Sequence, residues 1–305
     1  MTCVVCKSTE TEILFKTKDY TGNSDYRYTL KRCVVCGLVF VNPSEVSHQL
    51  NECYPSDYRP YQKPKSTISR SKIKRLLKEL QWDNPKLSKS PYLLDIGCGA
   101  GSDLRAFRQI GWKVAGVEID RTASERARAE GLDVFCGTIF EARFPANTFE
   151  IIRLRHVLEH LPNPREALAE IKRILKPGGQ VIIITPNTRS FNFTFFRECW
   201  YHLDTPRHLN LFNETGLKQL AGNLGFKIRM ITYDSGTKGL RESIQRWAEE
   251  YQNQSFPGWK RPLGILIQSI KFSQVSLFKY LLTPFSMVLD ILRWGDTIKM
   301  VFQKP

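Results

Sequence analysis

The stretch Leu94-Asp95-Ile96-Gly97-Cys98-Gly99-Ala100-Gly101 decides the fold of this chain. An apolar run from Tyr92 to Ile96 predicts a buried strand, which three glycines at alternate positions bring to an end. An amphipathic helix is expected to follow, from Ser102 to Ile110. Glycine lets the backbone approach a ligand closely, and the amino terminus of a helix offers unpaired N–H groups. The order of strand, glycine turn and helix therefore predicts a nucleotide-type binding turn.

A second strand is expected from Lys113 to Ile119, and it runs into Asp120. Near its tip lies Glu118, about 20 residues past the glycines, where nucleotide-binding folds hold a ribose diol. Asp95 precedes the first glycine by two residues, and a carboxylate there would repel a pyrophosphate but suit an ammonium or sulfonium group. The pattern favours a cationic nucleoside over a dinucleotide, with a tight turn in an unrelated α/β domain as the alternative.

This arrangement resembles the first motif of class I S-adenosylmethionine (SAM) methyltransferases. A second match follows in the right order: a fourth strand from Thr148 to Arg155, a helix, the turn Lys176 to Gly179, and a fifth strand from Gln180 to Thr185. The resemblance is closest to bacterial enzymes near the ubiquinone-pathway O-methyltransferases and the sugar methyltransferases. It implies an α/β fold with a Rossmann-like, doubly wound, mostly parallel sheet.

The resemblance also implies which residues would bind SAM. The expected cofactor-binding residues are Asp95, Gly97, Gly99, Gly101, Glu118, Ile119, Thr138, Ile139 and Arg155. Methyltransferases of this class often carry an acid directly after the third strand's glycine, to bind the adenine amine, whereas Thr138 follows Gly137 here. Adenine recognition would then use the Thr138 hydroxyl, backbone groups and the apolar side chains of Ile139 and Phe140.

A cluster of histidines and a carboxylate follows the fourth strand. His156, Glu159 and His160 fall at helical spacing on the edge where doubly wound sheets hold their ligands, and His208 lies downstream. These four are the candidate catalytic residues. Three interpretations stay open: His156 or His160 acts as a general base, Glu159, His160 and His208 hold a second divalent metal, or the cluster only caps the following loop. Related enzymes carry Glu where this chain has His156, which weakens the metal interpretation.

Two matched cysteine pairs open the chain. Cys3-x-x-Cys6 and Cys33-x-x-Cys36 have the spacing of two knuckles that complete a tetrahedral four-sulfur zinc site. All four positions would be filled by sulfur, so we expect a structural zinc ribbon, with a redox dithiol pair as the alternative. The expected organisation is a zinc ribbon at 1–45, a basic linker and amphipathic helix at 46–90, a SAM-binding core at 91–235, a helical insertion or lid at 236–294 and a final core strand at 295–305.

The composition limits where the protein works and what it binds. Its 305 residues carry a formal charge of +15, which points to an anionic partner without naming one. The basic residues concentrate in 59–90, yet no nucleic-acid-binding motif accompanies them, so a solvated packing helix is preferred over nucleic-acid binding. The start of the chain lacks the pattern of a signal peptide, and a cytoplasmic location is expected.

The insertion has an apolar, lightly basic second part. Residues 262–294 suit an intramolecular lid, a homodimer contact or peripheral attachment to a membrane, but not a membrane span. The aromatic segment from Phe191 to Tyr201 suits a substrate cover or plain packing, and Arg207 could pair with an anionic substrate. The predicted function is SAM-dependent methyl transfer to an oxygen or carbon of a small-molecule, sugar or lipid-linked acceptor. The alternatives are an RNA methyltransferase and a non-catalytic SAM-fold binding protein.

Overall fold

The computed structural model describes residues 2–20, 26–42, 45–46, 68–80, 90–252 and 275–305. The chain divides into two compact units. The first unit comprises residues 1–53, 185–217 and 232–299, and the second comprises residues 54–184, 218–231 and 300–305. The paired cysteines lie in the first unit, and the glycine turn lies in the second.

A seven-stranded sheet carries the glycine turn, in the order β10-β11-β8-β7-β4-β5-β6. From β8 to β6 all strand pairs run parallel, which gives the Rossmann-like α/β sheet that the sequence predicts. The strands are β4 (Tyr92–Ile96), β5 (Lys113–Glu118), β6 (Val134–Cys136), β7 (Phe149–Arg155), β8 (Leu175–Pro186), β10 (Lys227–Asp234) and β11 (Thr297–Gln303). The expected order of strands and helices is thus confirmed.

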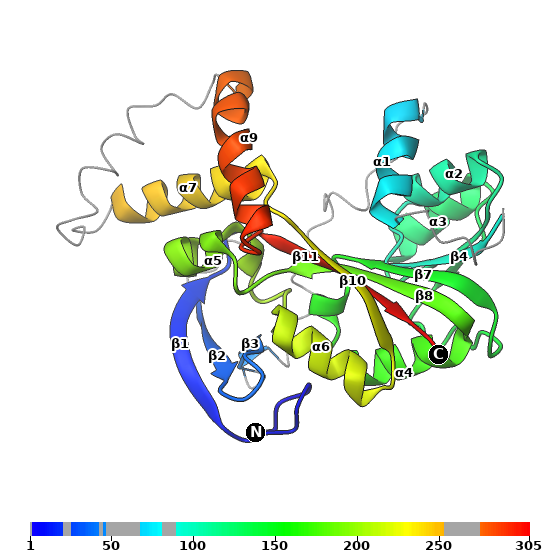
Figure 1. Cartoon of the computed structure of the whole chain (residues 1–305), viewed down its shortest axis with the longest axis horizontal. Helices are drawn as coiled ribbons and strands as arrows, with labels where there is room; N and C mark the ends of the chain where they lie inside the picture. Colours follow the sequence, from blue (N-terminus) through cyan, green and yellow to red (C-terminus); the bar gives the residue numbers. More distant parts are fainter. Residues whose placement is uncertain (1, 21–25, 43–44, 47–67, 81–89, 253–274) are drawn as a thin grey trace. The chain divides into compact units, whose positions relative to one another are not determined.

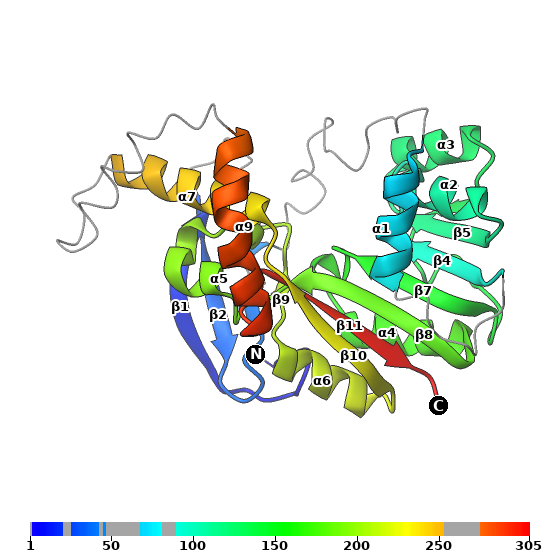
Figure 2. The same ribbon diagram turned by 45° about the horizontal axis from the view of Figure 1, so that its top comes forward.

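Helices cover both faces of this sheet. In Figures 1 and 2, α1 (Arg70–Leu80), α2 (Ser102–Gln109) and α3 (Arg121–Ala129) lie on one face, and α4 (Pro164–Ile174) lies on the other. An apolar core lies on the α1 and α2 face, and its buried members include Leu76, Leu80, Leu93, Leu104, Phe107, Ile151 and Ile182. Burying the apolar stripe of α1 against the sheet accounts for a helix whose outer face is basic.

The junction between α4 and β8 differs from the sequence prediction. The turn expected at 176–179 lies within β8, because the strand begins at Leu175, directly after the helix. Phe149 of β7 pairs with Leu175, whereas Ile151 pairs with Gln180, so β8 bulges where the glycines stand. Glycines occur both in turns and in irregular strands of this kind. This explains why the sequence predicts a turn here.

The last strand, β11, lies between β10 and β8, as expected. The backbone of Lys304, directly after β11, exchanges two hydrogen bonds of 3.0 Å with Gly178 and Gly179 at the start of β8. The end of one strand therefore meets the start of the other. The two strands are therefore antiparallel.

The first unit is built on a four-stranded sheet of order β1-β2-β3-β9. Its strands are β1 (Thr11–Lys18), β2 (Arg27–Cys33), β3 (Val39–Val41) and β9 (Asn210–Leu211). Val39 of β3 pairs with Leu211 of β9, so the ribbon sheet is completed by a segment that lies about 170 residues later in the chain. The cysteine-bearing segment therefore shares one sheet with residues that follow β8.

The described residues of this unit also form the helices α5 (Phe191–Phe196), α7 (Thr237–Gln252) and α9 (Val275–Ile291). Side chains from the aromatic segment form its core with the ribbon, and the fully buried members include Leu30, Val39, Cys199, Trp200 and Trp247. Phe193 and Phe196 belong to this core, which supports plain packing for them. Residues 253–274, which include much of the predicted membrane-contact segment, lie outside the described residues. Among the described helices, none has the length and apolar content needed to cross a membrane.

Candidate functional site

The glycine turn between β4 and α2 has the strained backbone that the sequence predicts. Gly97, Gly99 and Gly101 all adopt positive φ angles, of 70°, 55° and 75°. A Cβ on Gly97 would lie 2.4 Å from a methyl carbon of Val157, and one on Gly101 would lie 2.3 Å from Leu132. Both the backbone angle and the close contacts therefore require glycine here.

Glu118, at the tip of β5, is joined directly to this turn. Its two carboxylate oxygens accept hydrogen bonds from the backbone N–H groups of Gly99, at 2.7 Å, and Asp120, at 2.9 Å. Burial raises the pKa of Glu118, and these hydrogen bonds oppose that rise. The acid predicted to hold a ribose and the glycines predicted to approach the cofactor thus meet at one edge of the sheet. The neighbouring Ile119 is 71% exposed, as a residue lining an open site would be.

Asp95 is buried beneath the turn, in contact with an arginine. Both of its carboxylate oxygens accept hydrogen bonds from Arg153 of β7, at 2.9 and 2.8 Å. Arg153 also donates to Asp103 of α2, at 2.8 Å, and to Glu79 of α1, at 3.1 Å. Arg153 is not among the residues predicted from the sequence, although a charge next to Ile151, Ile152 and Leu154 is a signal that could have found it.

The segment after β6 carries a carboxylate that the sequence analysis also missed. Glu141 accepts hydrogen bonds from the backbone N–H of Thr138, at 2.7 Å, and from its hydroxyl, at 2.8 Å. An acid therefore does stand beside the predicted adenine position, displaced by three residues along the chain. Ile139 is buried and Phe140 is about half exposed, so these two could offer apolar contacts to a base.

Three of the four predicted catalytic residues lie directly after β7. Glu159 and His160 lie in the 3-10 turn η4 (Leu158–His160), and His156 precedes it with a φ of 53°. Nδ1 of His156 lies 3.3 Å from a carboxylate oxygen of Glu159, whose side chain is fully buried. This contact brings Nδ1 of His156 next to a buried carboxylate oxygen, without the geometry of a hydrogen bond. Arg155, also predicted to bind the cofactor, has its Nε 3.5 Å from Glu79 of α1.

The remaining predicted residues of this region belong to the first unit. His208 is buried, and its Nδ1 lies 2.7 Å from the backbone carbonyl oxygen of His202. The metal site predicted from Glu159, His160 and His208 joins residues of different units and stays a prediction. The guanidinium of Arg207 donates to Asp19, at 2.8 and 3.1 Å, and to Asp204, at 2.8 Å. Arg207 therefore links the segment that precedes β9 to the N-terminal ribbon. This structural role takes the place of the suggested contact with an anionic substrate.

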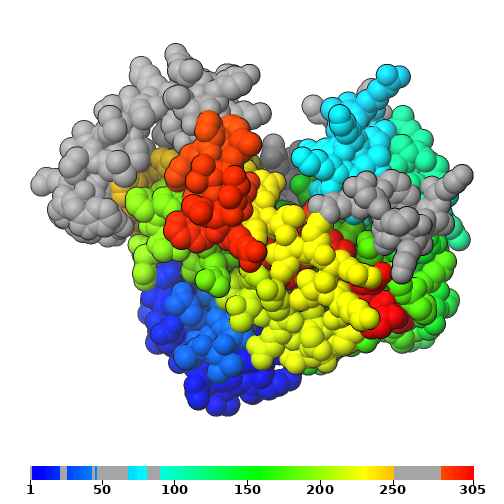
Figure 3. Space-filling model, viewed as in Figure 1, coloured from blue at the N-terminus to red at the C-terminus, as the bar shows by residue number. Residues whose placement is uncertain are grey.

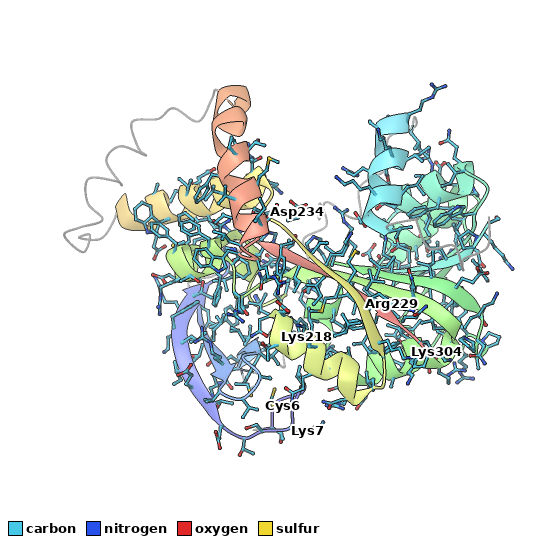
Figure 4. The ribbon with its side chains drawn as sticks, viewed as in Figure 1. Cys6, Lys7, Lys218, Arg229, Asp234 and Lys304 are labelled. Carbon is cyan, nitrogen blue, oxygen red and sulfur yellow. The ribbon has the colours of Figure 1, made fainter. Side chains whose placement is uncertain are left out.

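The four paired cysteines come together in the first unit. The sulfur of Cys3 lies 3.5 Å from that of Cys36, the sulfur of Cys6 lies 3.4 Å from that of Cys33, and all four sulfurs lie within 4.8 Å of one another. Zinc–sulfur bonds of about 2.3 Å place the sulfurs of a tetrahedral site about 3.8 Å apart. The sulfur positions therefore fit a zinc ion. Figure 4 labels Cys6 in the loop that precedes β1.

Known proteins match part of this chain. The family model described as a methyltransferase domain matches residues 61–230. An uncharacterized methyltransferase of Schizosaccharomyces pombe is 34% identical over 110 residues, which are 31% of this chain and 40% of that protein. A ubiquinone biosynthesis O-methyltransferase of Nitrosococcus oceani is 33% identical over 102 residues, which are 31% of this chain and 43% of that protein.

Among solved structures, a SAM-dependent methyltransferase of Archaeoglobus fulgidus is similar, with a TM-score of 0.49 and 19% identity over 77% of this chain and 95% of the other. The matched region spans less than half the length of the two curated relatives. The family model, by contrast, covers more than half of this chain, including the glycine turn, Glu118 and the His156–Glu159 pair. By this match, the chain belongs to the family of methyltransferase domains.

Proposed function

We propose that this protein is a SAM-dependent methyltransferase. The observation that carries the proposal is the hydrogen bond between the Gly99 N–H and Glu118, because it places the predicted ribose acid and the glycine turn at one edge of the sheet. SAM supplies a methyl group on a sulfonium, and its nucleoside would lie across the ends of β4 and β5. Glu118 would hold the ribose, and Ile139 and Phe140 would contact the adenine.

The His156–Glu159 pair supports an acceptor that must lose a proton. Nδ1 of His156 lies beside Glu159, and the other ring nitrogen, Nε2, could remove a proton from a hydroxyl or an acidic carbon. Transfer in line with the leaving sulfur otherwise needs mainly positioning and exclusion of water. We therefore favour an oxygen or carbon acceptor on a small molecule, a sugar or a lipid-linked precursor. The similarity to a ubiquinone biosynthesis O-methyltransferase is consistent with this class.

We further propose a structural zinc ion at Cys3, Cys6, Cys33 and Cys36. Four thiolates fill the coordination shell of zinc and leave no position for a substrate, so the ion would stabilise the ribbon without taking part in catalysis. The hydrogen bond between the sulfurs of Cys3 and Cys36 lowers the pKa of the Cys3 thiol and raises that of the Cys36 thiol. Zinc binds cysteine in its thiolate form.

Calorimetry with SAM and its demethylated product, S-adenosylhomocysteine, tests the cofactor assignment. We expect binding to the wild-type protein and a loss of affinity of about tenfold or more in Glu118→Gln, because the ribose loses a charge-assisted hydrogen bond. Glu125→Gln, on the exposed face of α3 and paired with Arg121, is the matched control and should bind like wild type. If the wild-type protein binds neither compound, the proposal is wrong.

Incubation with methyl-labelled SAM and fractionated cell extract, followed by mass spectrometry, identifies the acceptor. Label in a small-molecule or lipid fraction supports the proposed class, whereas label in RNA would favour the alternative enzyme. His156→Gln should lower turnover about a hundredfold or more while leaving SAM affinity unchanged, because general-base catalysis contributes roughly that much. If the His156→Gln variant turns over as fast as wild type, His156 is not the general base.

A further inference from the structure

The second unit contains a buried arginine that the proposed chemistry does not use. The side chain of Arg153 is only 3% exposed, in a strand whose neighbouring residues are apolar and buried. Placing a charge in such a position is costly unless partners neutralise it and satisfy its hydrogen bonds. Its surroundings therefore show what it is paired with and what it holds in place.

Three carboxylates from three different elements surround Arg153. Asp95 of β4 binds it through two parallel hydrogen bonds, and Asp103 of α2 and Glu79 of α1 accept one each, at 2.8 and 3.1 Å. The guanidinium also lies 5.6 Å from the centre of the Phe107 ring of α2. A planar guanidinium with this many partners has one orientation, and so have the carboxylates that it binds.

The same cluster fastens α1 to the start of α2. Lys72, in the first turn of α1, contacts Asp103 at 2.9 Å and donates to the backbone carbonyl of Ser102 at 2.9 Å. Glu79, in the last turn of α1, contacts Arg153 and, at 3.5 Å, Arg155. The first turn of α1 is thus held by an ion pair to α2, and its last turn by ion pairs to β7.

Arg153 acts on the position where the proposed SAM site begins. Asp95 stands two residues before Gly97, and its buried carboxylate would act on a ligand ammonium at this turn through its charge. Burial raises the pKa of Asp95, and the charge of Arg153 opposes that rise. Without the guanidinium, a buried carboxylate would take up a proton or turn away, and two further carboxylates would be left facing it.

We infer that Arg153 is a positioning residue for the proposed SAM site, acting through the Asp95 carboxylate. This inference rests on the proposed function, because it concerns the affinity of the same site. Arg153 touches no predicted reacting atom, so its loss should raise the KM for SAM and leave kcat close to the wild-type value. A general loss of folded protein would instead reduce the active fraction and lower apparent kcat at unchanged KM.

A double-mutant cycle measured by calorimetry with S-adenosylhomocysteine tests the inference. Asp95→Asn and Arg153→Met should each weaken binding about tenfold or more. The double variant should bind with the affinity of the single variant that binds less tightly. Once one charge of the Asp95–Arg153 pair is gone, removing the other costs no further affinity. Additive losses, giving about a hundredfold in the double variant, would show that Arg153 does not act through Asp95.

Two further variants separate positioning from stability. Arg105→Met is the matched control: it lies on α2, is 11% exposed, and its Nη1 is 3.5 Å from Glu130, so it should bind like wild type. Arg153→Lys keeps the charge but loses the paired hydrogen bonds, and we expect an intermediate affinity with kcat retained. It also replaces Arg153→Met if that variant does not fold, and wild-type affinity in Arg153→Lys would overturn the inference.

The wild-type measurement separates this inference from the proposed function. If the wild-type protein does not bind the ligand, the proposed function is wrong and the inference with it. If the wild type binds and the cycle is additive, the inference alone is wrong.

Discussion

At the scale of single residues, Gly97 shows how the backbone restricts the cofactor turn. It combines a φ of 70° with a neighbour that leaves no room, since a Cβ would lie 2.4 Å from Val157. Gly111 has a φ of 85° but nothing within 4 Å of a Cβ. At both positions a side chain would cost free energy because of the positive φ angle. Only at Gly97 would it also clash with a neighbour.

Alanine at these two positions should separate the two costs. Gly111→Ala should reduce the free energy of unfolding by about 1 kcal/mol, the cost of a left-handed conformation for a residue with a Cβ. Gly97→Ala should lose roughly 1–3 kcal/mol more, because Val157 must move to admit the methyl group. Urea unfolding of both variants provides the measurement. Equal losses of unfolding free energy would mean that Val157 moves away from the new methyl group at no cost.

Single residues also show where reading the sequence succeeds and where it stops. The glycines and Glu118 could be predicted because their spacing along the chain fixes their place at the ends of adjacent parallel strands. The pairing of Asp95 with Arg153 could not, because it depends on β4 and β7 being neighbours with these two residues opposite each other. That register follows from the sheet order, which no local pattern contains.

At the scale of elements, strands and helices with a clear hydrophobic period were predicted well, and long-range pairings were not. The sequence predicts β4, α2, β5 and β7 to within one or two residues. The short strand β9 has only two residues and exists because β3 provides its partner. An element of this kind has no periodicity of its own to recognise.

The helix α9, drawn in orange to red in Figure 3, ends in turns whose apolar side chains are exposed within the described part of the chain. Its last turns and the following loop expose Phe285, Met287, Val288, Ile291, Leu292 and Trp294. Two arginines border these side chains: Arg293 lies between Leu292 and Trp294, and Arg189 stands two residues before Phe191, whose ring lies 5.4 Å from that of Phe285. Apolar side chains bordered by arginines suit the surface of an anionic membrane.

We therefore predict that this surface binds anionic lipid vesicles. Wild-type protein should sediment with vesicles that contain phosphatidylglycerol, and less so with phosphatidylcholine alone or at high salt. A variant with Met287→Glu and Ile291→Glu should bind at least tenfold more weakly. Ile13→Glu, which changes a residue of β1 that is 69% exposed, is the matched control and should bind normally. A concentration-dependent dimer that the double variant abolishes, without vesicle binding, would instead assign the surface to a second copy of the chain.

At the scale of the whole molecule, the proposed zinc ion belongs to a unit assembled from three separate stretches of chain. Gly37, next to Cys36, packs against Asn213, and β3 pairs with β9. Arg207 binds Asp19 across 188 residues of sequence. The cysteine knuckles are thus connected to residues 185–217 through backbone, packing and charge.

Removing the metal should therefore loosen residues far along the chain from the cysteines. We expect about one zinc per chain in the purified protein, almost none in Cys33→Ser, and an unchanged content in Cys136→Ser, whose cysteine lies in β6. After chelation, hydrogen exchange should increase in β9 and α5 as well as in β2, because small ribbons owe much of their stability to the ion. The amides of β4 and β5 should keep their protection, since they belong to the other unit. If exchange increases only within 1–45, the ribbon is an independent domain and the shared sheet contributes little to its stability.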